Sequence, residues 1–212
     1  MSNIAAIRKE YILRSLSENE VNKNPIHQFA TWWDDAVDSK IEEVNAMTVA
    51  TVNEHGYPSA RIVLLKHFNE NGFVFFTNYE SRKGKSLLIN PNASIVFFWK
   101  ELERQVRIEG IVEKVSEEES TTYFKSRPVE SKIGAWASPQ SEVIESRTFL
   151  ENRFKDFEEQ FLNLEIPKPP HWGGYIVKPS RIEFWQGRPG RLHDRIEYNK
   201  NNEDWSIERL AP

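Results

Sequence analysis

The stretch AMTVATVNEHGYPSARIVLLKH, residues 46–67, decides the fold expected for this chain. On each side of the segment 54–58, side chains alternate between apolar and polar, and the Gly and Pro inside that segment are typical of a turn. Two period-two runs joined by a short turn predict an antiparallel β-hairpin, with strands at residues 46–53 and 59–67.

The same signals recur along the rest of the chain. A turn at residues 69–72 opens the next strand, and further turn signals separate the later ones. The period-two runs predict strands at residues 73–78, 93–100, 104–115, 174–178, 181–186, 191–198 and 205–210. Short hairpin connections favour antiparallel pairing and an α+β fold over a parallel sheet. Six or more twisted antiparallel strands close most readily into a barrel, because closure removes exposed edges.

Helices are predicted between the groups of strands. An N-cap followed by proline, a capping box and a Ser-Pro pair mark helix starts. The expected helices begin at Asn24 and Pro25, span residues 79–90, run from Ser116 and Glu119 to about Pro128, and begin at Ser138 and Pro139. The apolar stripes are Ile26, Phe29, Trp33 and Val37 in the first helix, and Leu150, Phe154, Phe157 and Phe161 in the last.

Length and composition limit the possible functions. The 212 residues predict one domain, residues 21–212, preceded by a helix or mobile arm at residues 1–20. A net charge of −4 argues against a general nucleic-acid binder, and the absence of cysteine excludes disulfides and a thiolate nucleophile. The five histidines show no metal-binding spacing, so no metal is expected. No signal peptide or membrane span is visible, which predicts a soluble, cytoplasmic protein.

The segment IEFWQGRPGRLHDRIEY, residues 182–198, is the first candidate for chemistry. A turn at residues 187–190 is followed by a predicted strand that presents Arg191, His193 and Arg195 on one face. Two cations beside an ionisable imidazole are typical of a site for an anionic ligand. A solvated strand in a half-exposed hairpin explains the same pattern, and the segment alone does not decide between them.

Two groups of cations suggest phosphate sites. Arg61 and Lys66 end an apolar strand on opposite faces, so they either serve two anionic groups or are solvent-exposed strand ends. Residues 77–86 enter a helix, where hydroxyls, Arg82, Lys83 and free main-chain N–H groups can hold a phosphate. The tail of this segment imitates a nucleotide-binding P-loop, but tyrosine occupies the position of its first glycine, which excludes that motif.

Other polar side chains extend the candidate site. Tyr123 and Arg127 share a helix face, and Ser131 follows the break at Pro128, which suits a second phosphate. Gln105 offers an amide donor and acceptor to the edge of a heterocycle. Two further residues, Gln140 and Ser141, are expected in the first turn of the helix opened at residue 138.

Seven motifs together resemble the pyridoxine/pyridoxamine 5′-phosphate oxidase family, flavoproteins of vitamin B6 metabolism. They cover the chain from about residue 46 to its end, in the order of the family. The motifs are RIVLLK (61–66), FFTNYESRKG (75–84), RQVRIEG (104–110), YFKSRPVESKIGAWASPQS (123–141), WGGYIVKP (172–179), FWQGRPGRLHDR (184–195) and RLAP (209–212).

This resemblance implies an FMN-binding split β-barrel with flanking helices, forming a homodimer with FMN at the subunit interface. It implies that Arg61, Arg82 and Lys83 hold the FMN phosphate. The implied lining of the rest of the flavin is Ile62, Val63, Leu64, Leu65, Lys66, Phe76, Thr77, Gln105, Gln140, Ser141, Trp185 and Arg195. The implied substrate residues are Lys66, Tyr123, Arg127 and Ser131 at the phosphate, Arg191, Leu192 and His193 at the ring, and Arg8 and Tyr11 in an N-terminal arm.

The implied reaction oxidises pyridoxine 5′-phosphate or pyridoxamine 5′-phosphate to pyridoxal 5′-phosphate, with Arg191 and His193 as catalytic residues. Electrons pass through FMN to O2 and give H2O2, and the amine also releases ammonia. Glu43 stands where some relatives have Asp. Two alternatives are another split-barrel flavoprotein, such as a flavin reductase, and a non-catalytic module that carries flavin or pyridoxal phosphate. The Arg191–His193 pair and the Tyr123 set argue against a reductase.

Overall fold

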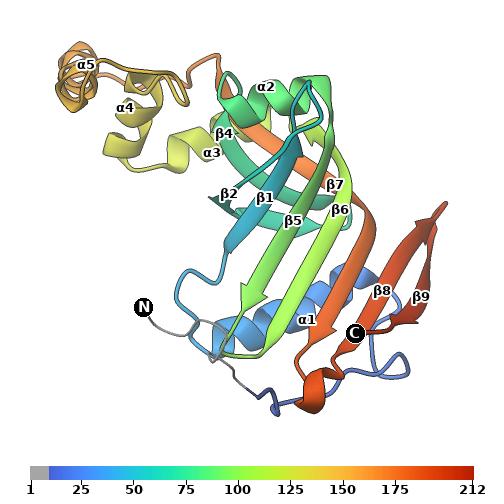
Figure 1. Ribbon diagram of the computed structural model, residues 1–212. Coiled ribbons are helices and arrows are strands. Elements are labelled where there is room, and N and C mark those ends of the chain that lie inside the picture. The colour runs from blue at the N-terminus through green and yellow to red at the C-terminus, as the bar shows by residue number, and fades with distance from the viewer. Residues whose placement is uncertain (1–9) are drawn as a thin grey trace, which may run out of the picture.

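One curled antiparallel sheet organises residues 10–212, the part of the chain that the computed structural model describes (Figure 1). The predicted hairpins are confirmed, with strand ends within a few residues of the expected positions. The nine strands of this part are β1 (Ala46–Val52), β2 (Pro58–Leu64), β3 (His67–Asn69), β4 (Gly72–Asn78), β5 (Asn92–Trp99), β6 (Arg104–Lys114), β7 (Trp172–Gln186), β8 (Asp194–Asn201) and β9 (Asp204–Leu210).

The sheet curls into a split barrel through the connection between β2 and β3. The strand order is β2-β1-β5-β6-β7-β4-β3, so β2 and β3 are the ends of the order although they are consecutive in the chain. The Leu65 N–H donates to the Asn45 carbonyl beside β1, at 2.8 Å, and the Lys66 N–H donates to the Val74 carbonyl of β4, at 2.8 Å. The chain therefore changes its hydrogen-bonding partner from β1 to β4 between two adjacent residues.

The C-terminal strands differ from the prediction in two ways. The segments 174–178 and 181–186 form one 15-residue strand, β7, which spans the sheet and also pairs with β8. The strand predicted at residues 191–198 begins only at Asp194, because Pro189–Arg191 form a short 3-10 turn in which Arg191 has a left-handed φ of 63°. The prediction that Arg191 and His193 alternate along a strand is therefore wrong.

The helix at Asn24 and Pro25 is confirmed, although its buried face differs slightly from the predicted stripe. Helix α1 (Pro25–Asp38) begins with the Asn24 side chain accepting the Ile26 N–H at 2.7 Å. Trp32 and Ala36 are buried on this helix, whereas Val37 is 47% exposed. The buried face is thus rotated by one residue toward Trp32.

The predicted start of the last helix at residue 138 is wrong, although the helix that carries Leu150, Phe154 and Phe157 exists. Val129–Ala137 form helix α4, residues 138–146 are not helical, and helix α5 (Arg147–Gln160) is capped by the side chain of Ser146. Ser138 and Pro139 therefore end one helix instead of opening another, and Gln140 and Ser141 lie in the connecting loop. The remaining helices, α2 (Arg82–Ile89) and α3 (Glu117–Ser126), match the prediction, and α3 has its expected N-cap at Ser116.

The described part of the N-terminal segment, residues 10–20, contains no helix and lies against the sheet. Leu16 is buried in the main core cluster, and its N–H donates to Asp194 at 3.0 Å. The division of the chain into an arm and one domain stays a prediction. Within residues 10–212, no helix is long and apolar enough to span a membrane.

Phe29 of α1 joins the helix to the inside of the sheet. Its side chain is fully buried, and its ring centroid lies 4.8 Å from that of Phe68, 4.9 Å from Phe73 and 5.2 Å from Phe97. Because these rings belong to β3, β4 and β5, one side chain packs against strands from both halves of the strand order. Phe29 therefore stabilises the curl of the sheet.

Replacing Phe29 with Ala should destabilise the protein by about 3–5 kcal/mol, because the change removes the contacts of the buried Phe29 ring with its neighbours and leaves a cavity. The midpoint of urea unfolding, at fixed protein concentration, measures this loss. Val37→Ala on the exposed side of the same helix is the matched control and should change stability by less than about 0.5 kcal/mol. Equal effects of the two changes would contradict this account of the core.

Candidate active site

A cavity of about 700 Å³ lies between β2, β4 and the helices α3 and α4. The sequence predicted many of its lining residues, although it did not predict α4. Residues named in advance that line it are Ile62, Val63, Leu64, Lys66, Phe76, Thr77, Lys83, Tyr123, Arg127, Ser131 and Gln140. Its wall also includes Trp172 and Asn78, at the start of β7 and the end of β4, which sequence reasoning missed. The WGGYIVKP motif begins at this tryptophan and was the available signal.

Three cations gather at one end of this region. Arg61 donates to the Val49 carbonyl at 3.1 Å and to the Thr51 hydroxyl at 2.9 Å, which ties its side chain to β1. Burial lowers the pKa of Arg61, and the positive charge of Arg82 lowers it further. Burial also lowers the pKa of Lys83 to about 8, with a further contribution from Arg61.

This cation cluster, defined as Arg61, Arg82 and Lys83, has no carboxylate partner among residues 10–212. The nearest polar partner of the Lys83 ammonium in another segment is the Gln140 side-chain oxygen, at 3.1 Å. Like charges that share a partly buried region repel one another and lose hydration. An anionic ligand would relieve both costs, so the cluster is a candidate anion site.

Helix α2 contributes its first turn to the same cluster. The Ser81 side chain accepts the Gly84 N–H at 3.3 Å, which caps the helix directly before Arg82 and Lys83. Glycine is needed at position 84, because a Cβ there would lie 2.0 Å from the Tyr79 carbonyl oxygen. The positive end of the helix dipole therefore adds to the charge of the two side chains.

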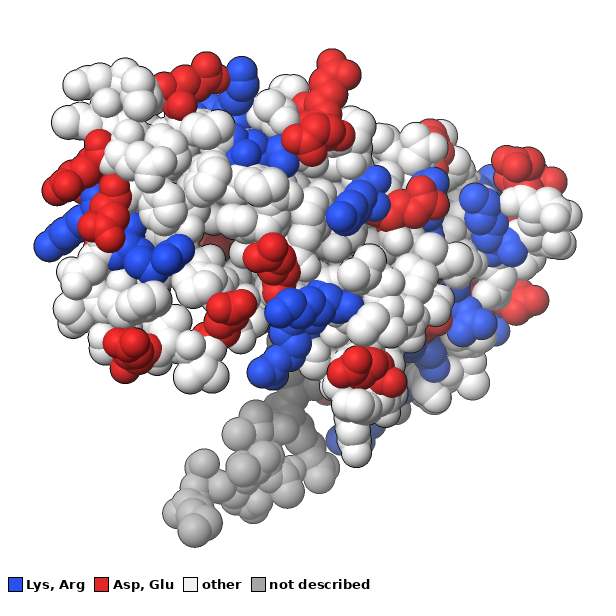
Figure 2. Space-filling model, turned by 90° about the horizontal axis from the view of Figure 1, so that it is seen from above, with Lys and Arg blue, Asp and Glu red and all other residues white. Residues whose placement is uncertain are grey.

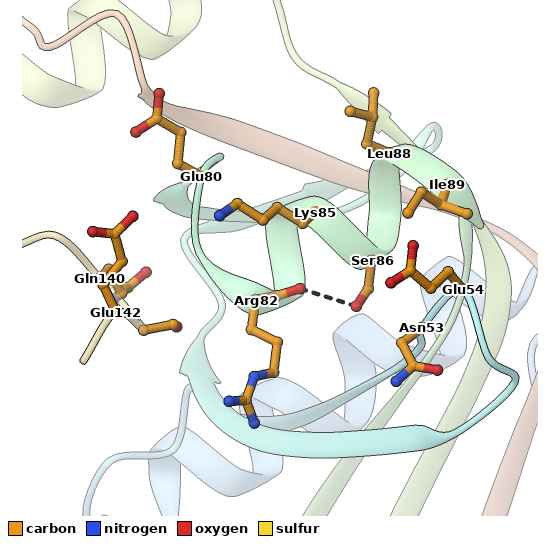
Figure 3. Close-up of a pocket in the computed structure, with 11 residues that line it drawn as sticks. Asn53, Glu54, Glu80, Arg82, Lys85, Ser86, Leu88, Ile89, Gln140 and Glu142 are labelled. Atoms are coloured by element: carbon orange, nitrogen blue, oxygen red, sulfur yellow. Dashed lines mark hydrogen bonds between the residues drawn. The ribbon is translucent and has the colours of Figure 1, made fainter.

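A second cavity, of about 500 Å³, lies on the other side of this helix turn. Figure 3 shows Arg82 and Lys85 extending from α2, with Glu142 on the loop that faces them and the Ser86 hydroxyl bonded to the Arg82 carbonyl. Two residues predicted at the flavin, Gln140 and Ser141, lie on this loop, where Ser141 has a left-handed φ of 75°. The loop, not a helix N-terminus, presents them to the site.

A second cationic region lies on the α3 side of the larger cavity. One guanidinium nitrogen of Arg127 is buried and has no hydrogen-bond partner within residues 10–212. The guanidinium lies 4.8 Å from the centroid of the Trp172 ring, and burial lowers the pKa of Arg127. The Lys66 ammonium lies 5.9 Å from the centroid of the Tyr123 ring on the same cavity. This region can therefore receive a second anion.

Aromatic rings form the wall between these cations. The Phe76 ring stacks on Tyr123, with centroids 4.1 Å apart, and on Trp172, with centroids 5.4 Å apart. Stacked rings fix the phenol of Tyr123 and the electron-rich face of Trp172 that the Arg127 guanidinium covers. The arrangement suits a planar ligand that carries a phosphate.

Five further predicted residues form a separate cluster where the start of β6, the end of β7 and the start of β8 meet the N-terminal segment. Gln105 lies opposite Trp185, and Trp185 lies opposite Arg195, in one row across the sheet. The His193 ring centroid is 4.6 Å from that of Trp185 and 5.9 Å from that of Tyr11. We call these five residues the histidine cluster.

Arg195 in this cluster is held by other protein groups. Its guanidinium donates to the two carboxylate oxygens of Glu183, at 2.8 and 3.1 Å, and to the Ala211 carbonyl at 2.8 Å. The hydrogen bond with Glu183 raises the pKa of Arg195. Because Glu183 is only 4% exposed and also accepts from Arg107 at 3.1 Å, it fixes Arg195 in one position.

The elements that line the large cavity and those that carry the histidine cluster lie at opposite ends of the sheet (Figure 1). Thr77, which lines the cavity, is paired with Gly173 at the start of β7, whereas Gln105 is paired with Trp185 near the end of that strand. Twelve residues of an extended strand span on the order of 40 Å. One chain therefore cannot bring both groups of predicted residues around one small ligand.

Five residues named in the sequence analysis remain to be placed. Arg191 and Leu192 are exposed in the turn before β8, where Leu192 is 74% exposed. Leu65 is buried in the main core instead of lining the cavity. Arg8 lies outside the described residues. Glu43 is exposed in the turn before β1, with a left-handed φ of 48°.

Comparison with known proteins assigns the family. Residues 33–161 match the family described as "Pyridoxamine 5'-phosphate oxidase", and residues 172–212 match "Pyridoxine 5'-phosphate oxidase C-terminal dimerisation region". The chain is an enzyme of the pyridoxamine 5′-phosphate oxidase family. Two similar proteins are both named pyridoxine/pyridoxamine 5′-phosphate oxidase. The one from Trichormus variabilis is 59% identical to this chain, over 99% of this chain and 98% of its own length. The one from Paraburkholderia phytofirmans is 56% identical over the full length of both chains.

Solved structures agree with the fold. The crystal structure of PhzG from Burkholderia lata in complex with tetrahydrophenazine-1-carboxylic acid has a TM-score of 0.89 and 28% identity, covering 94% of this chain and 99% of that chain. A pyridoxamine 5′-phosphate oxidase-related, FMN-binding protein from Nostoc punctiforme has a TM-score of 0.69 and 18% identity, covering 87% and 97%. The split barrel predicted for the oxidase family is therefore confirmed.

Sulfate should bind to the flavin-free protein with an affinity that falls as the pH rises from about 7 to about 9, because Lys83 loses its charge through a pKa of about 8. Sulfate keeps its own charge over this range, and isothermal titration calorimetry measures the affinity. Lys83→Met should weaken binding about tenfold at the lower pH and flatten the pH dependence. Lys100→Met, at an exposed lysine, is the control. An unchanged pH dependence in Lys83→Met would show that this ammonium is outside the anion site.

Proposed function

We propose that this chain catalyses the oxidation of pyridoxine 5′-phosphate or pyridoxamine 5′-phosphate to pyridoxal 5′-phosphate. The alcohol and O2 give the aldehyde and H2O2, while the amine, O2 and water give the aldehyde, ammonia and H2O2. The observation that carries this proposal is a cavity bordered by two cationic regions that lack carboxylate partners within residues 10–212. Two phosphates need two such regions, and the full-length relatives named for this activity support the choice of ligands.

The residues present fit FMN as the cofactor. A phosphate at the cation cluster would act as the counter-ion that Arg61, Arg82 and Lys83 do not have within residues 10–212. The first turn of α2 would contribute main-chain N–H groups to the same phosphate. The strand segment Ile62–Leu64 and Thr77 would line the rest of the flavin. FMN would supply the redox chemistry by accepting two electrons from the substrate and passing them to O2.

The second cationic region is proposed to hold the substrate phosphate. Arg127 has a buried donor that finds no partner among residues 10–212, and Lys66, Tyr123 and Ser131 line the same cavity. Each charge-assisted hydrogen bond contributes roughly 1.5–3 kcal/mol, so a few contacts suffice to retain the substrate. Anchoring the two phosphates separately would fix the two rings relative to each other, which is a proximity effect.

The histidine cluster is proposed to complete the site from a second copy of the chain. It lies too far from the cavity to serve the same chain. Three of its five residues, Trp185, His193 and Arg195, belong to residues 172–212, which match a dimerisation region. Trp185, Gln105 and Arg195 would then contact the flavin across the subunit interface. Arg191 and His193 would lie over the substrate ring, where they would orient it and manage the proton that leaves its 4′ group.

The purified protein should be yellow and should form peroxide when given pyridoxine 5′-phosphate or pyridoxamine 5′-phosphate. In an anaerobic cuvette, each productive substrate should bleach the flavin absorbance, which separates substrate oxidation from the reaction with O2. Flavin that is bleached only by a nicotinamide nucleotide would indicate a reductase. Bound flavin that neither vitamer bleaches would indicate a carrier, and both results would contradict the proposal.

Arg127→Ala should raise the KM for the substrate about tenfold to a hundredfold while FMN stays bound, because it removes a charge-assisted contact to the substrate phosphate alone. Steady-state kinetics and the flavin absorbance of the purified variant measure the two effects. Loss of FMN with an unchanged KM would show that the two cationic regions have been assigned to the wrong ligands.

Mixing Arg127→Ala with His193→Ala tests whether one site uses two chains. In a dimer with shared sites, a hybrid has one doubly altered site and one intact site. Random exchange of subunits in an equal mixture should therefore restore about a quarter of the wild-type sites. Activity is measured after unfolding and refolding the two variants together, with separately refolded samples as controls. No recovery in a mixture that refolds and binds flavin would place each site within one chain.

A further inference from the structure

Lys168 lies in the connection between α5 and β7, and protein encloses its ammonium although the residue does not line the large cavity. Its side chain is only 5% exposed. The ammonium donates to the Trp172 carbonyl at 2.9 Å and to the Pro169 carbonyl at 3.2 Å, and it lies 3.1 Å from the Glu117 carboxylate. Burying an ammonium costs free energy unless its donors are paired, so these three contacts keep it in place.

These contacts join two elements that border the second cationic region. Trp172 is the first residue of β7 and Glu117 is the first residue of α3, so Lys168 connects the start of the strand to the start of the helix. The Glu117 side chain is 80% exposed, and water screens its attraction for the ammonium. The Trp172 N–H also donates to the Pro169 carbonyl, at 3.1 Å. The main chain of Trp172 is therefore held on both sides, and Lys168 supplies one of the two attachments.

The connection that carries Lys168 is anchored on both sides of this residue. Before it, the Trp136 indole N–H of α4 donates to the Pro167 carbonyl at 2.8 Å. After it, the Tyr79 N–H, directly beyond β4, donates to the His171 carbonyl at 2.7 Å. The ammonium thus extends from a main chain that is itself fixed, and it can hold Trp172 in one place.

Trp172 in turn supports Arg127. The indole is 6% exposed, and the Arg127 guanidinium lies 4.8 Å from its centroid. Phe124 meets the indole edge-on, with centroids 5.1 Å apart, and its own centroid lies 5.7 Å from the guanidinium. One guanidinium nitrogen is buried without a hydrogen-bond partner in the described part of the chain. Ring contacts therefore direct this free donor, and the placement of the indole decides where it points.

We infer that Lys168 is a positioning residue for the anion-binding region around Arg127. It fixes the main chain of Trp172, so that the indole holds the guanidinium where the substrate phosphate is proposed to bind. This inference rests on the proposed function for the identity of the anion. It deepens that function, because it gives a role in substrate affinity to a residue outside the cavity lining. Lysine suits the position, since its ammonium has three donors for two carbonyls and a carboxylate.

Lys168→Met keeps the apolar stem of the side chain and removes its three donors. In the FMN-loaded protein, this change should weaken the binding of inorganic phosphate about tenfold, the effect of misplacing one charge-assisted hydrogen bond. It should raise the KM for pyridoxine 5′-phosphate by the same factor, change kcat by less than about twofold and leave FMN bound. Calorimetric titration with phosphate, steady-state kinetics and the flavin absorbance measure these effects. Arg127→Ala should remove the same phosphate binding, which identifies the site.

Two neighbouring substitutions serve as controls. Glu117→Gln removes the exposed carboxylate but leaves Lys168 on both carbonyls, so phosphate affinity should change by less than about twofold. Lys125→Met breaks an exposed ion pair with Glu165 in the small pocket that Lys168 also lines, and it should bind phosphate like the wild type. An equal loss in Lys125→Met and Lys168→Met would show a general effect of positive charge and would overturn the positioning role.

A double-mutant cycle separates positioning from a general loss of packing. Because Lys168 acts through Arg127, adding Lys168→Met to Arg127→Ala should raise the KM further by less than about twofold. A further tenfold rise would overturn the inference, and so would wild-type phosphate binding in flavin-bound Lys168→Met. Lys168→Gln, which keeps one amide donor, replaces Lys168→Met if that variant is not recovered folded, and the same outcomes decide.

The phosphate titration also separates this inference from the proposed function, because binding of inorganic phosphate needs no turnover. Phosphate binding that depends on Lys168 and Arg127, in a flavin-bound protein that oxidises neither vitamer, would support the positioning role and contradict the proposed activity alone. Normal oxidation of both vitamers with unchanged phosphate binding and KM in Lys168→Met would contradict the positioning role alone.

Discussion

Repulsion among cations without counter-ions is the constraint around which this site is built. Arg61 comes from β2, whereas Arg82 and Lys83 come from the first turn of α2, which follows β4. These elements meet because the chain changes partner from β1 to β4 at Leu65 and Lys66. The apolar core that closes the barrel thus offsets the cost of gathering the cations, and the cost is recovered when an anion binds.

The length of β7 separates the two groups of candidate site residues. A strand of 15 residues begins at the large cavity and ends at the histidine cluster, so the same element that joins the two groups also keeps them apart. An enzyme that needs both groups around one pair of ligands must obtain one of them from another subunit. The match of residues 172–212 to a dimerisation region is what this geometry requires. Under the proposed function, dimerisation and catalysis would depend on each other, because neither half-site would be sufficient alone.

The sequence predicted hairpins and the α1 cap well, because alternation and capping are local signals. It failed where tertiary contacts decide. Residues 138–146 stay non-helical although Ser138 and Pro139 resemble a helix start, since Ser146 caps α5 instead. Arg191 looked like a strand residue by period, yet the Pro189–Arg191 turn places it outside β8. The sequence also did not reveal that the predicted site residues form two separate groups, because the order of the motifs does not give the distance between residues at the two ends of a long strand.

The arginines of the two half-sites differ in a way that indicates their roles. Arg195 donates three hydrogen bonds to Glu183 and Ala211, and its pKa is raised, so its charge is already balanced within the chain. Arg127 has a buried nitrogen without a partner in the described part of the chain, and burial lowers its pKa. A guanidinium that is already paired shapes a surface and gains little from an anion, whereas an unpaired one gains the full value of a charge-assisted bond. Arg195 is therefore better suited to hold the start of β8 in place, and Arg127 to bind an anion. The C-terminal residues matter for the same reason, since the Ala211 carbonyl is one of the three groups that keep Arg195 in position.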